Sequence, residues 1–131
     1  MLDELMTISV NLRLEKAREC LASAVQNAEL EAYATAANRS YYCIFHAIRA
    51  VLITVGFSAK KHSGNISEFQ RLYVKTKIFP DTFSDIISRA FYVRNKSDYD
   101  DYYVVAKAEV LQQIANARVF LEAVENYIGG L

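Results

Sequence analysis

Proline and glycine are scarce in this 131-residue sequence, which contains one proline and four glycines. These residues break helices and form turns, so a chain with so few of them favours long helices. Strong helix formers such as alanine, leucine and glutamate are frequent instead. The sequence therefore predicts an all-α fold. Its length and its 53% apolar content are sufficient for a single domain, residues 1–131, with its own hydrophobic core.

Long apolar runs and clusters of metal-binding side chains are also missing. No stretch of eighteen apolar residues occurs, so we expect no membrane span. The first residues include no basic segment before an apolar one, so we expect no secretory signal and a cytoplasmic location. Cys20 and Cys43 fall inside expected helices and predict small buried side chains rather than a disulfide. His46 and His62 have no partners at ligand spacing, so we expect no metal and no other cofactor.

The sequence also lacks net charge, because fifteen basic residues balance fifteen acidic ones. Proteins that bind nucleic acid usually have a strongly basic face. Any contact with RNA must therefore come from a local cluster of basic side chains or from a groove between two copies of the chain.

Apolar residues recur at three- and four-residue spacing in five segments, which predicts five helices. The expected helices cover about residues 3–27, 30–55, 66–75, 82–96 and 103–128. Helices joined by short connections favour an antiparallel up-and-down bundle of four to five helices. Ser63 or Asn65 is a candidate cap for the third helix, and Thr82 with Asp85 forms a capping-box-like pair at the fourth.

The second helix is expected to be apolar over more than one stripe. The stripe that its spacing predicts consists of Ala34, Ala37, Tyr41, Ile44, Ile48, Val51 and Val55. Tyr42 and the Phe91–Tyr92 pair of the fourth helix add aromatic surface beyond such stripes. Excess apolar width indicates a second buried face, so we expect a homodimer.

The segment RAFYVRNKSDYDDYY, residues 89–103, has the most unusual pattern in the chain. Arg94 falls on the stripe that Ile87 and Ala90 define as buried. A buried guanidinium needs a carboxylate, and Asp98 lies four residues further on, within reach on a helix. The pattern is consistent with a structural ion pair, with an arginine held to grip a phosphate group, or with both.

Other basic side chains are candidates for ligand contacts. His46 and Arg49 lie on the polar face of the second helix, and Lys61 and His62 belong to a small basic loop. Each has an ordinary explanation too, because a lone histidine among apolar neighbours is usually structural and a basic loop is usually solvated. The ligand-binding candidates are Arg89, Arg49, His46, Lys61 and His62.

Three segments resemble those of the HEPN domain family and occur in the order of that family. RSYYCIFHAIRAVL (39–52) resembles its second-helix signature, KHSGNISEF (61–69) resembles the next loop and helix, and RAFYVRNKSDYDD (89–101) resembles its arginine segment. The resemblance extends over about residues 13–127. It implies a small helical bundle that dimerises, with the arginine motif near the groove between the two copies.

The family resemblance also implies an activity. Many HEPN proteins are metal-independent endoribonucleases, and several are toxins encoded beside a minimal nucleotidyltransferase antitoxin. In these toxins an arginine is followed four to six residues later by a histidine. Here Arg94 is followed at those distances by Asp98, Tyr99 and Asp100.

Two functions remain open on this resemblance. The first is a toxin-like subunit that acts on or binds RNA and works with a minimal nucleotidyltransferase. Its candidate catalytic residues would be Arg94, Asp98 and Tyr99, and Tyr99 would be the nearest match to the tyrosine that such a partner modifies with adenylate. The second, favoured by the missing histidine, is a non-catalytic module that binds a nucleotide or a protein partner.

Overall fold

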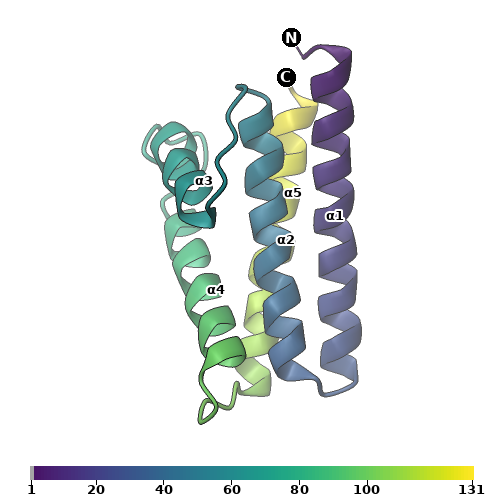
Figure 1. Ribbon diagram of the computed structural model, residues 1–131, viewed down its shortest axis with the longest axis vertical. Helices are drawn as coiled ribbons and strands as arrows, with labels where there is room; N and C mark the ends of the chain where they lie inside the picture. The colour runs from purple at the N-terminus through teal and green to yellow at the C-terminus, as the bar shows by residue number, and fades with distance from the viewer. Residues whose placement is uncertain (1) are drawn as a thin grey trace.

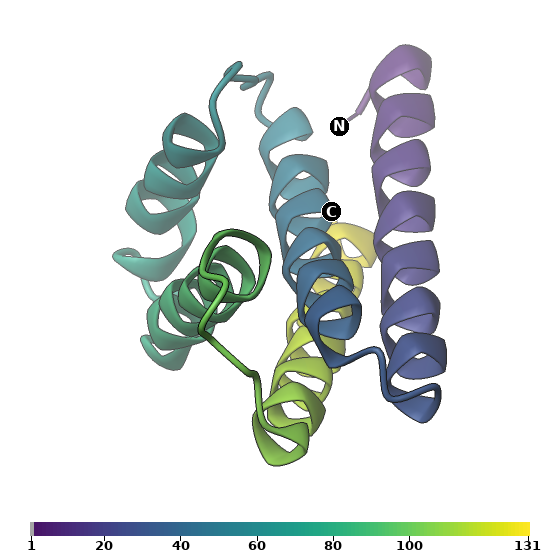
Figure 2. The ribbon, with the colours of Figure 1, turned by 60° about the horizontal axis from the view of Figure 1, so that its bottom comes forward.

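Three long helices stand side by side in a computed structural model that describes residues 2–131 (Figure 1). They are α1 (Glu4–Glu29), α2 (Tyr33–Ile53) and α5 (Lys107–Gly129). The chain between α2 and α5 forms α3 (His62–Phe69), a π-helical turn η1 (Gln70–Val74) and α4 (Thr82–Tyr99). In Figure 2 this part lies on one side of α2 and α1 lies on the other.

This architecture confirms the expected fold class. Five α-helices and no strand occur in residues 2–131. The long helices α1, α2, α4 and α5 alternate in direction along the chain, so the molecule is an antiparallel up-and-down bundle (Figure 1). The pair formed by α3 and η1 lies in the connection between α2 and α4.

The helix α2 is the centre of the bundle. It packs against α1, α3, α4 and α5. Helices that are covered on several sides need an apolar surface wider than one stripe, and α2 has it. Its buried side chains are Ala36, Ala37, Ser40, Tyr41, Cys43, Ile44, Phe45, Ala47, Ile48, Ala50, Val51 and Leu52.

Aromatic rings fill the core between α5 and the segment from α3 to α4. Phe120 of α5 is fully buried, and its ring centroid lies 4.7 Å from that of Phe83 and 5.5 Å from that of Phe69. Phe79 continues the stack, 5.3 Å from Phe83. A second, smaller cluster around Val93, with Val105, Val110 and Ile114, closes the opposite end of the bundle.

Several helix ends differ from the expected ones. The fourth helix continues past residue 96 to Tyr99, and the fifth begins at Lys107 rather than residue 103, so residues 100–106 form a connection. The third helix begins at His62 rather than residue 66, and the second begins at Tyr33 rather than residue 30. Periodicity alone located the helices but not these ends, because polar residues extend α3 and α4 beyond their apolar stripes, whereas α2 and α5 begin later than expected.

Both predicted helix caps are wrong. The residue that precedes α3 is Lys61, without a side-chain cap, and Asn65 is instead buried and bonds to the backbone of Ala59 and Lys61. The residue that precedes α4 is Asp81, and no side chain caps this helix. Backbone bonds of the turn at Pro80 take that role, because the Phe83 amide donates to the Pro80 carbonyl.

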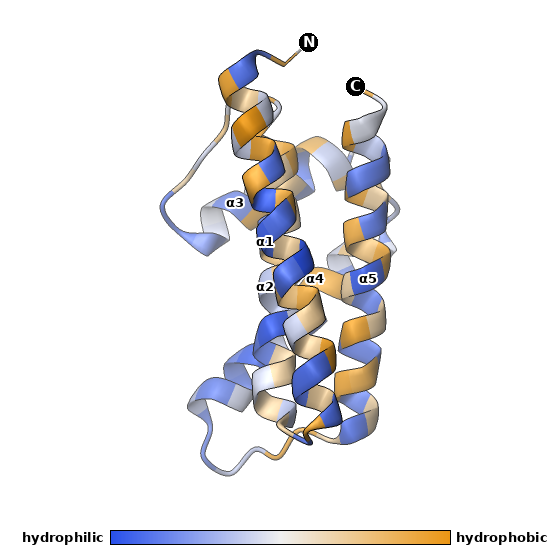
Figure 3. Ribbon diagram, turned by 90° about the vertical axis from the view of Figure 1, so that its right-hand side faces the viewer, coloured by the Kyte–Doolittle hydropathy of each residue, from blue (hydrophilic) through white to orange (hydrophobic). Residues whose placement is uncertain are grey.

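Two members of the expected stripe on α2 lie outside the core. Ala34 is exposed near the start of the helix, and Val55, 55% exposed, lies beyond its end. Figure 3 shows how apolar and polar residues alternate along α1 and α5, which have water on one side. Among residues 2–131, no helix has the length and apolar character needed to cross a membrane.

Replacing Phe120 by alanine should remove the centre of the aromatic stack. We expect Phe120→Ala to lower the free energy of unfolding by about 3–5 kcal/mol, because it leaves a cavity between α5 and α4. Denaturation in urea, followed by circular dichroism, measures the change. The adjacent Val119 is 55% exposed, so Val119→Ala is the matched control and should change stability by less than about 0.5 kcal/mol. Equal effects of the two variants would contradict this description of the core.

Candidate functional site

Arg94 occupies a core-like position on α4. Phe83, Ile87 and Ala90 are buried on one face of this helix, and Arg94 follows on the same face. Its side chain is only 14% exposed, so most of the guanidinium group has lost contact with water. A charge in such a position is stable only if neighbouring groups replace that water.

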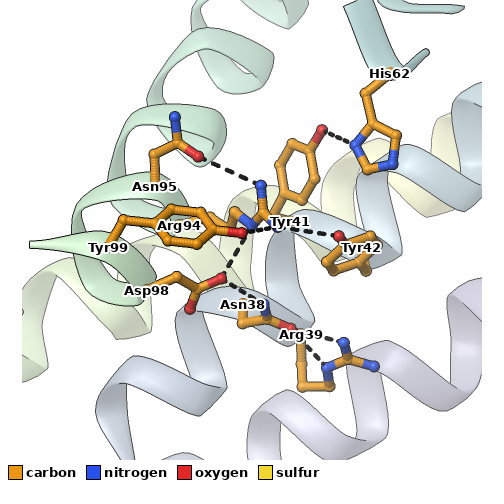
Figure 4. A network of polar contacts seen from close by, with 9 residues as sticks. All are labelled: Asn38, Arg39, Tyr41, Tyr42, His62, Arg94, Asn95, Asp98 and Tyr99. Atoms are coloured by element: carbon orange, nitrogen blue, oxygen red, sulfur yellow. Dashed lines mark hydrogen bonds and ion pairs between the residues drawn. The ribbon is translucent and has the colours of Figure 1, made fainter.

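Three tyrosine rings replace part of the water around the Arg94 guanidinium (Figure 4). The Arg94 Cζ atom lies 5.4 Å from the ring centroids of Tyr41 and Tyr42 and 5.5 Å from that of Tyr99. A cation near an aromatic ring is attracted by the electron-rich face of the ring. The Nη2 group also donates to the Tyr42 hydroxyl at 3.1 Å and, more weakly, to the Tyr99 hydroxyl at 3.5 Å.

A carboxylate completes the surroundings of this arginine. The Asp98 Oδ2 atom lies 3.1 Å from Arg94 Nε, as the four-residue spacing predicts. The approach is not aligned with the N–H bond, so the contact is an ion pair without a hydrogen bond. Asp98 Oδ2 accepts its hydrogen bond from Asn38 Nδ2 at 2.9 Å, and Asn38 Oδ1 accepts two from Arg39. A polar chain thus connects the two arginines across α2 and α4 (Figure 4).

A histidine from a distant part of the sequence lies beside the same tyrosines. The first residue of α3, His62, has its Nδ1 atom 3.0 Å from the Tyr41 hydroxyl. Its ring stacks on Phe45 at 3.9 Å between centroids and lies 5.7 Å from Tyr42. His62 and Arg94 therefore contact the same pair of adjacent tyrosines of α2, from two different elements.

The pKa shifts of Tyr41 and His62 favour the uncharged forms of both side chains. Burial raises the pKa of Tyr41 to about 12, although the charge of Arg94 opposes the shift. Burial, and then the positive charges of Arg94 and Arg49, lower the pKa of His62. At neutral pH the imidazole is therefore a neutral group that can accept a proton, and Tyr41 keeps its own.

The other ligand-binding candidates do not join this cluster. Arg89 is 52% exposed and forms an ion pair with Glu109 of α5. Lys61 is exposed and directly precedes α3. His46 lies further along α2 and contacts Arg13 of α1. Arg49 donates to Ser58 and is close enough to His46 and His62 for its charge to lower the pKa of each.

His46 is held in its neutral form where α2 packs against α1. Its Nδ1 atom lies 3.2 Å from Arg13 Nη1, and an arginine can only donate, so Nδ1 accepts and the proton is on Nε2. Burial and the nearby charges of Arg13 and Lys16 from α1, and of Arg49 and Arg39 from α2, lower its pKa to about 4. His46 is thus a much weaker base than an ordinary histidine, and its Nδ1 lone pair is already used by Arg13.

Beside the Arg94 cluster, aromatic side chains border a shallow hollow in the surface. Phe91 and Tyr92 are 41% and 45% exposed, Tyr99 is 73% exposed and Tyr102 is 97% exposed. All four line this hollow together with Lys96 of α4 and the aspartates that follow the helix. An exposed aromatic surface of this kind is characteristic of a site where a partner binds.

Sequence reasoning missed three residues that the structure brings to these sites. Tyr41 was assigned to the core, and it is buried, but its hydroxyl reaches His62. Asn38 and Arg39 were not among the candidate residues, although Asn38 donates to Asp98 and accepts from Arg39. Their spacing relative to Tyr42 was the available signal, because residues three and four apart share one side of a helix.

The depressed pKa of His46 should make stability depend on pH. An unfolded histidine takes up a proton near pH 6.5, whereas folded His46 does so only near pH 4, so protons favour the unfolded chain between these values. As the pH falls from 7 to 4, the wild type should lose roughly 1–2 kcal/mol more unfolding free energy than His46→Gln, after allowance for solvent screening of this half-buried group. Urea denaturation at each pH measures the difference. Identical pH profiles of the two proteins would contradict it.

The comparisons with known proteins agree with the sequence resemblance. The family model of the HEPN domain matches residues 10–127. A Thermotoga maritima protein named "UPF0332 protein" is 34% identical over 116 residues, which are 88% of each chain.

Two Methanocaldococcus jannaschii proteins, each named as a "putative toxin", are also similar. One is 29% identical over 88% of this chain and 78% of its own length, and the other is 35% identical over 66% and 64%. The family match covers almost the whole bundle, including α2, α3 and the Arg94 segment. The chain therefore belongs to the HEPN domain family.

Proposed function

We propose that this protein is a toxin-like HEPN subunit that binds RNA and cleaves it without a metal ion. The observation that carries the proposal is the guanidinium of Arg94, which is fixed among three tyrosines with His62 beside the same rings. A fixed cation next to a neutral imidazole is the arrangement that cleavage of a phosphodiester requires. Its similarity to two relatives named as toxins supports the same function.

Arg94 would stabilise the charge that develops on the phosphate. Nη1 donates one N–H to Asn95 at 3.3 Å, which leaves its second N–H available for a phosphate oxygen. Asp98 and the tyrosine rings hold the guanidinium in one orientation, so little reorganisation is needed during the reaction. The exposed hydroxyl of Tyr99 lies next to Arg94 Nη2 and would donate a second hydrogen bond to the phosphate.

His62 would take the role of the histidine that the Arg94 segment lacks. If its Nδ1–H donates to Tyr41, the lone pair of Nε2 is free to accept the proton of a ribose 2′-hydroxyl. The 2′-oxygen then bonds to phosphorus, the bond from phosphorus to the 5′-oxygen breaks, and the leaving oxygen takes a proton from water. The resulting hydroxide takes the proton from the His62 imidazolium, which restores the neutral histidine. The products are a 2′,3′-cyclic phosphate and a 5′-hydroxyl end.

The proposed partners are a second copy of the chain and a minimal nucleotidyltransferase that acts as the antitoxin. The exposed Phe91 and Tyr92 side chains of α4 are the surface that a second copy would cover, which would bring two Arg94 sites close to one groove with Tyr99 at its edge. Tyr99, 73% exposed, is the accessible tyrosine next to Arg94, so adenylate attached to it would place a phosphate on the guanidinium. Such a modification would block the site.

A non-catalytic module is the second candidate function. The Arg94 guanidinium already donates to Tyr42, Tyr99 and Asn95 and pairs with Asp98, and several internal partners are typical of a structural arginine. In that case the site would bind a nucleotide or a protein partner without cleaving RNA.

Replacing Arg94 tests the proposed ribonuclease. We expect Arg94→Ala to slow cleavage of a fluorescent RNA in EDTA by about 100-fold or more, because the charge on the phosphate is no longer stabilised. Arg94→Lys keeps the charge without the planar fork and should lose most of the activity while staying folded. Arg71→Ala, which removes an exposed arginine paired with Glu68, is the control and should cleave normally.

The alternatives give different results in this experiment. Equal cleavage by all four proteins, or none by the wild type, would contradict the nuclease. A drop in melting temperature as the only effect of Arg94→Ala would assign Arg94 a structural role.

Replacing His62 separates proton transfer from RNA binding. We expect His62→Asn to reduce cleavage by about 100-fold with little change in RNA affinity, because proton acceptance contributes mainly in the transition state. The wild-type rate should stay high as the pH falls to 6.5 and drop only below it, since the pKa of His62 is lowered. Ser63→Ala, exposed on the same turn, is the control. A His62→Asn variant that cleaves like the wild type would remove His62 from the mechanism.

A further inference from the structure

Four basic side chains lie along the seam between α1 and α2, and we name this set the basic seam: Arg13, Lys16, Arg39 and Arg49. Two contacts fix the register of the seam, because Arg39 Nη1 lies 3.8 Å from Cys20 Sγ and Arg13 Nη1 lies 3.2 Å from His46 Nδ1. Arg13 and Cys20 are seven residues apart on α1, and their partners His46 and Arg39 are seven residues apart on α2 in the opposite direction. The basic seam extends over ~15 Å, since Arg39 and Arg49 are ten residues apart on a helix.

Among the described residues, no ion pair compensates the charges of the basic seam, and Glu19 is the acidic side chain whose charge acts on Cys20 there. Arg18, Arg71, Arg89 and Arg94 each form an ion pair with an acidic side chain, whereas no ion pair involves the basic seam in residues 2–131. Its three arginines contact neutral acceptors instead. Arg13 donates to His46, Arg39 donates to the Asn38 amide, and Arg49 donates to the Ser58 hydroxyl at 3.3 Å. These bonds orient the guanidinium groups and leave their charge available to a ligand.

The pKa of His46 reports the resulting positive potential. The four residues of the basic seam are the charges that lower it, in addition to burial. A chain with no net charge therefore has a local concentration of positive charge around His46. Such a concentration of positive charge attracts polyanions in a salt-dependent way.

The basic seam is continuous with the Arg94 cluster. The Cζ atom of Arg39 lies 5.2 Å from the Tyr42 ring centroid, and that of Arg94 lies 5.4 Å from it. The ring of His46 follows Tyr42 along α2 at 6.3 Å between centroids. Partly exposed aromatic rings interleaved with arginines are characteristic of surfaces that bind single-stranded nucleic acid, because the rings stack on bases while the cations contact phosphates.

We propose that the basic seam binds the phosphate backbone of a single RNA strand and directs it to Arg94. The inference rests on the proposed function and names the surface that holds the substrate. A length of ~15 Å corresponds to about four phosphates of a stacked strand, whose charges are ~3.4 Å apart. An acidic protein surface is a less suitable ligand, because it would not use the aromatic rings that separate the cations.

The test is the affinity for a 5′-fluorescein-labelled oligouridine of twelve nucleotides, measured by fluorescence anisotropy over a series of salt concentrations. We expect the double variant Arg13→Gln/Arg49→Gln to bind about tenfold more weakly at low salt. The slope of log K against log salt should become shallower by ~1.4, because two phosphate contacts are lost. Arg13→Lys/Arg49→Lys should keep the wild-type slope, and a melting curve of each variant checks that it is folded.

A matched control removes the same charge elsewhere. Lys75 and Lys107 are exposed and form no ion pair within residues 2–131, so Lys75→Gln/Lys107→Gln should bind like the wild type. If both double glutamine variants weakened RNA binding equally, the inference would be overturned, because only the net charge would matter.

The remaining outcomes separate the inference from the proposed function. Wild-type affinity of the seam variant, together with weakened binding by Arg94→Ala, would overturn the inference alone. No RNA binding by the wild type would overturn the proposed function and the inference with it. Equal competition by polyglutamate and by unlabelled oligouridine would overturn the assignment to RNA and favour an acidic protein partner.

Discussion

Burial of α2 on several sides determines where polar side chains can lie in this bundle. Because α1, α3, α4 and α5 all pack on this helix, its apolar side chains occupy most of its circumference. Its few polar side chains are thereby restricted to the seams where two neighbouring helices meet. The seam with α4 contains Tyr42 and Asn38, and the seam with α1 contains His46 and Arg39. Both proposed sites thus follow from how the core is packed.

The Arg94 cluster illustrates how a core position accepts a charge. One carboxylate and three tyrosines replace the water around the Arg94 guanidinium, and two of the tyrosines belong to α2. The rings attract the cation without neutralising it, so the guanidinium can still interact with an anion. A cluster of carboxylates in the same place would have satisfied the charge completely. Because its neighbours are aromatic, Arg94 would be able to bind phosphate, as the proposed function requires, and also closes the bundle.

The sequence predicted the parts of the molecule that depend on local spacing. Five helices follow from apolar periodicity, and the contact between Arg94 and Asp98 follows from their separation of four residues. Local spacing could not predict the contacts between segments that are distant in the sequence. The placement of His62 depends on how the loop after α2 returns over that helix, and the pairing of Arg13 with His46 depends on the register of α1 against α2. Helix ends and caps were missed because turn backbone bonds replaced side-chain caps.

The Arg94 cluster is built from two parts of the fold that differ in how firmly they are held. Tyr41 and Tyr42 belong to the middle of the central helix, whereas Asp98 and Tyr99 form the last turn of α4, next to the non-helical residues 100–106. The ends of helices open at a much lower free energy than the whole molecule. Unwinding that single turn would release the carboxylate and one ring together while the other two rings stay in place. Local melting of one helical turn would therefore change the surroundings of the Arg94 guanidinium without unfolding the bundle.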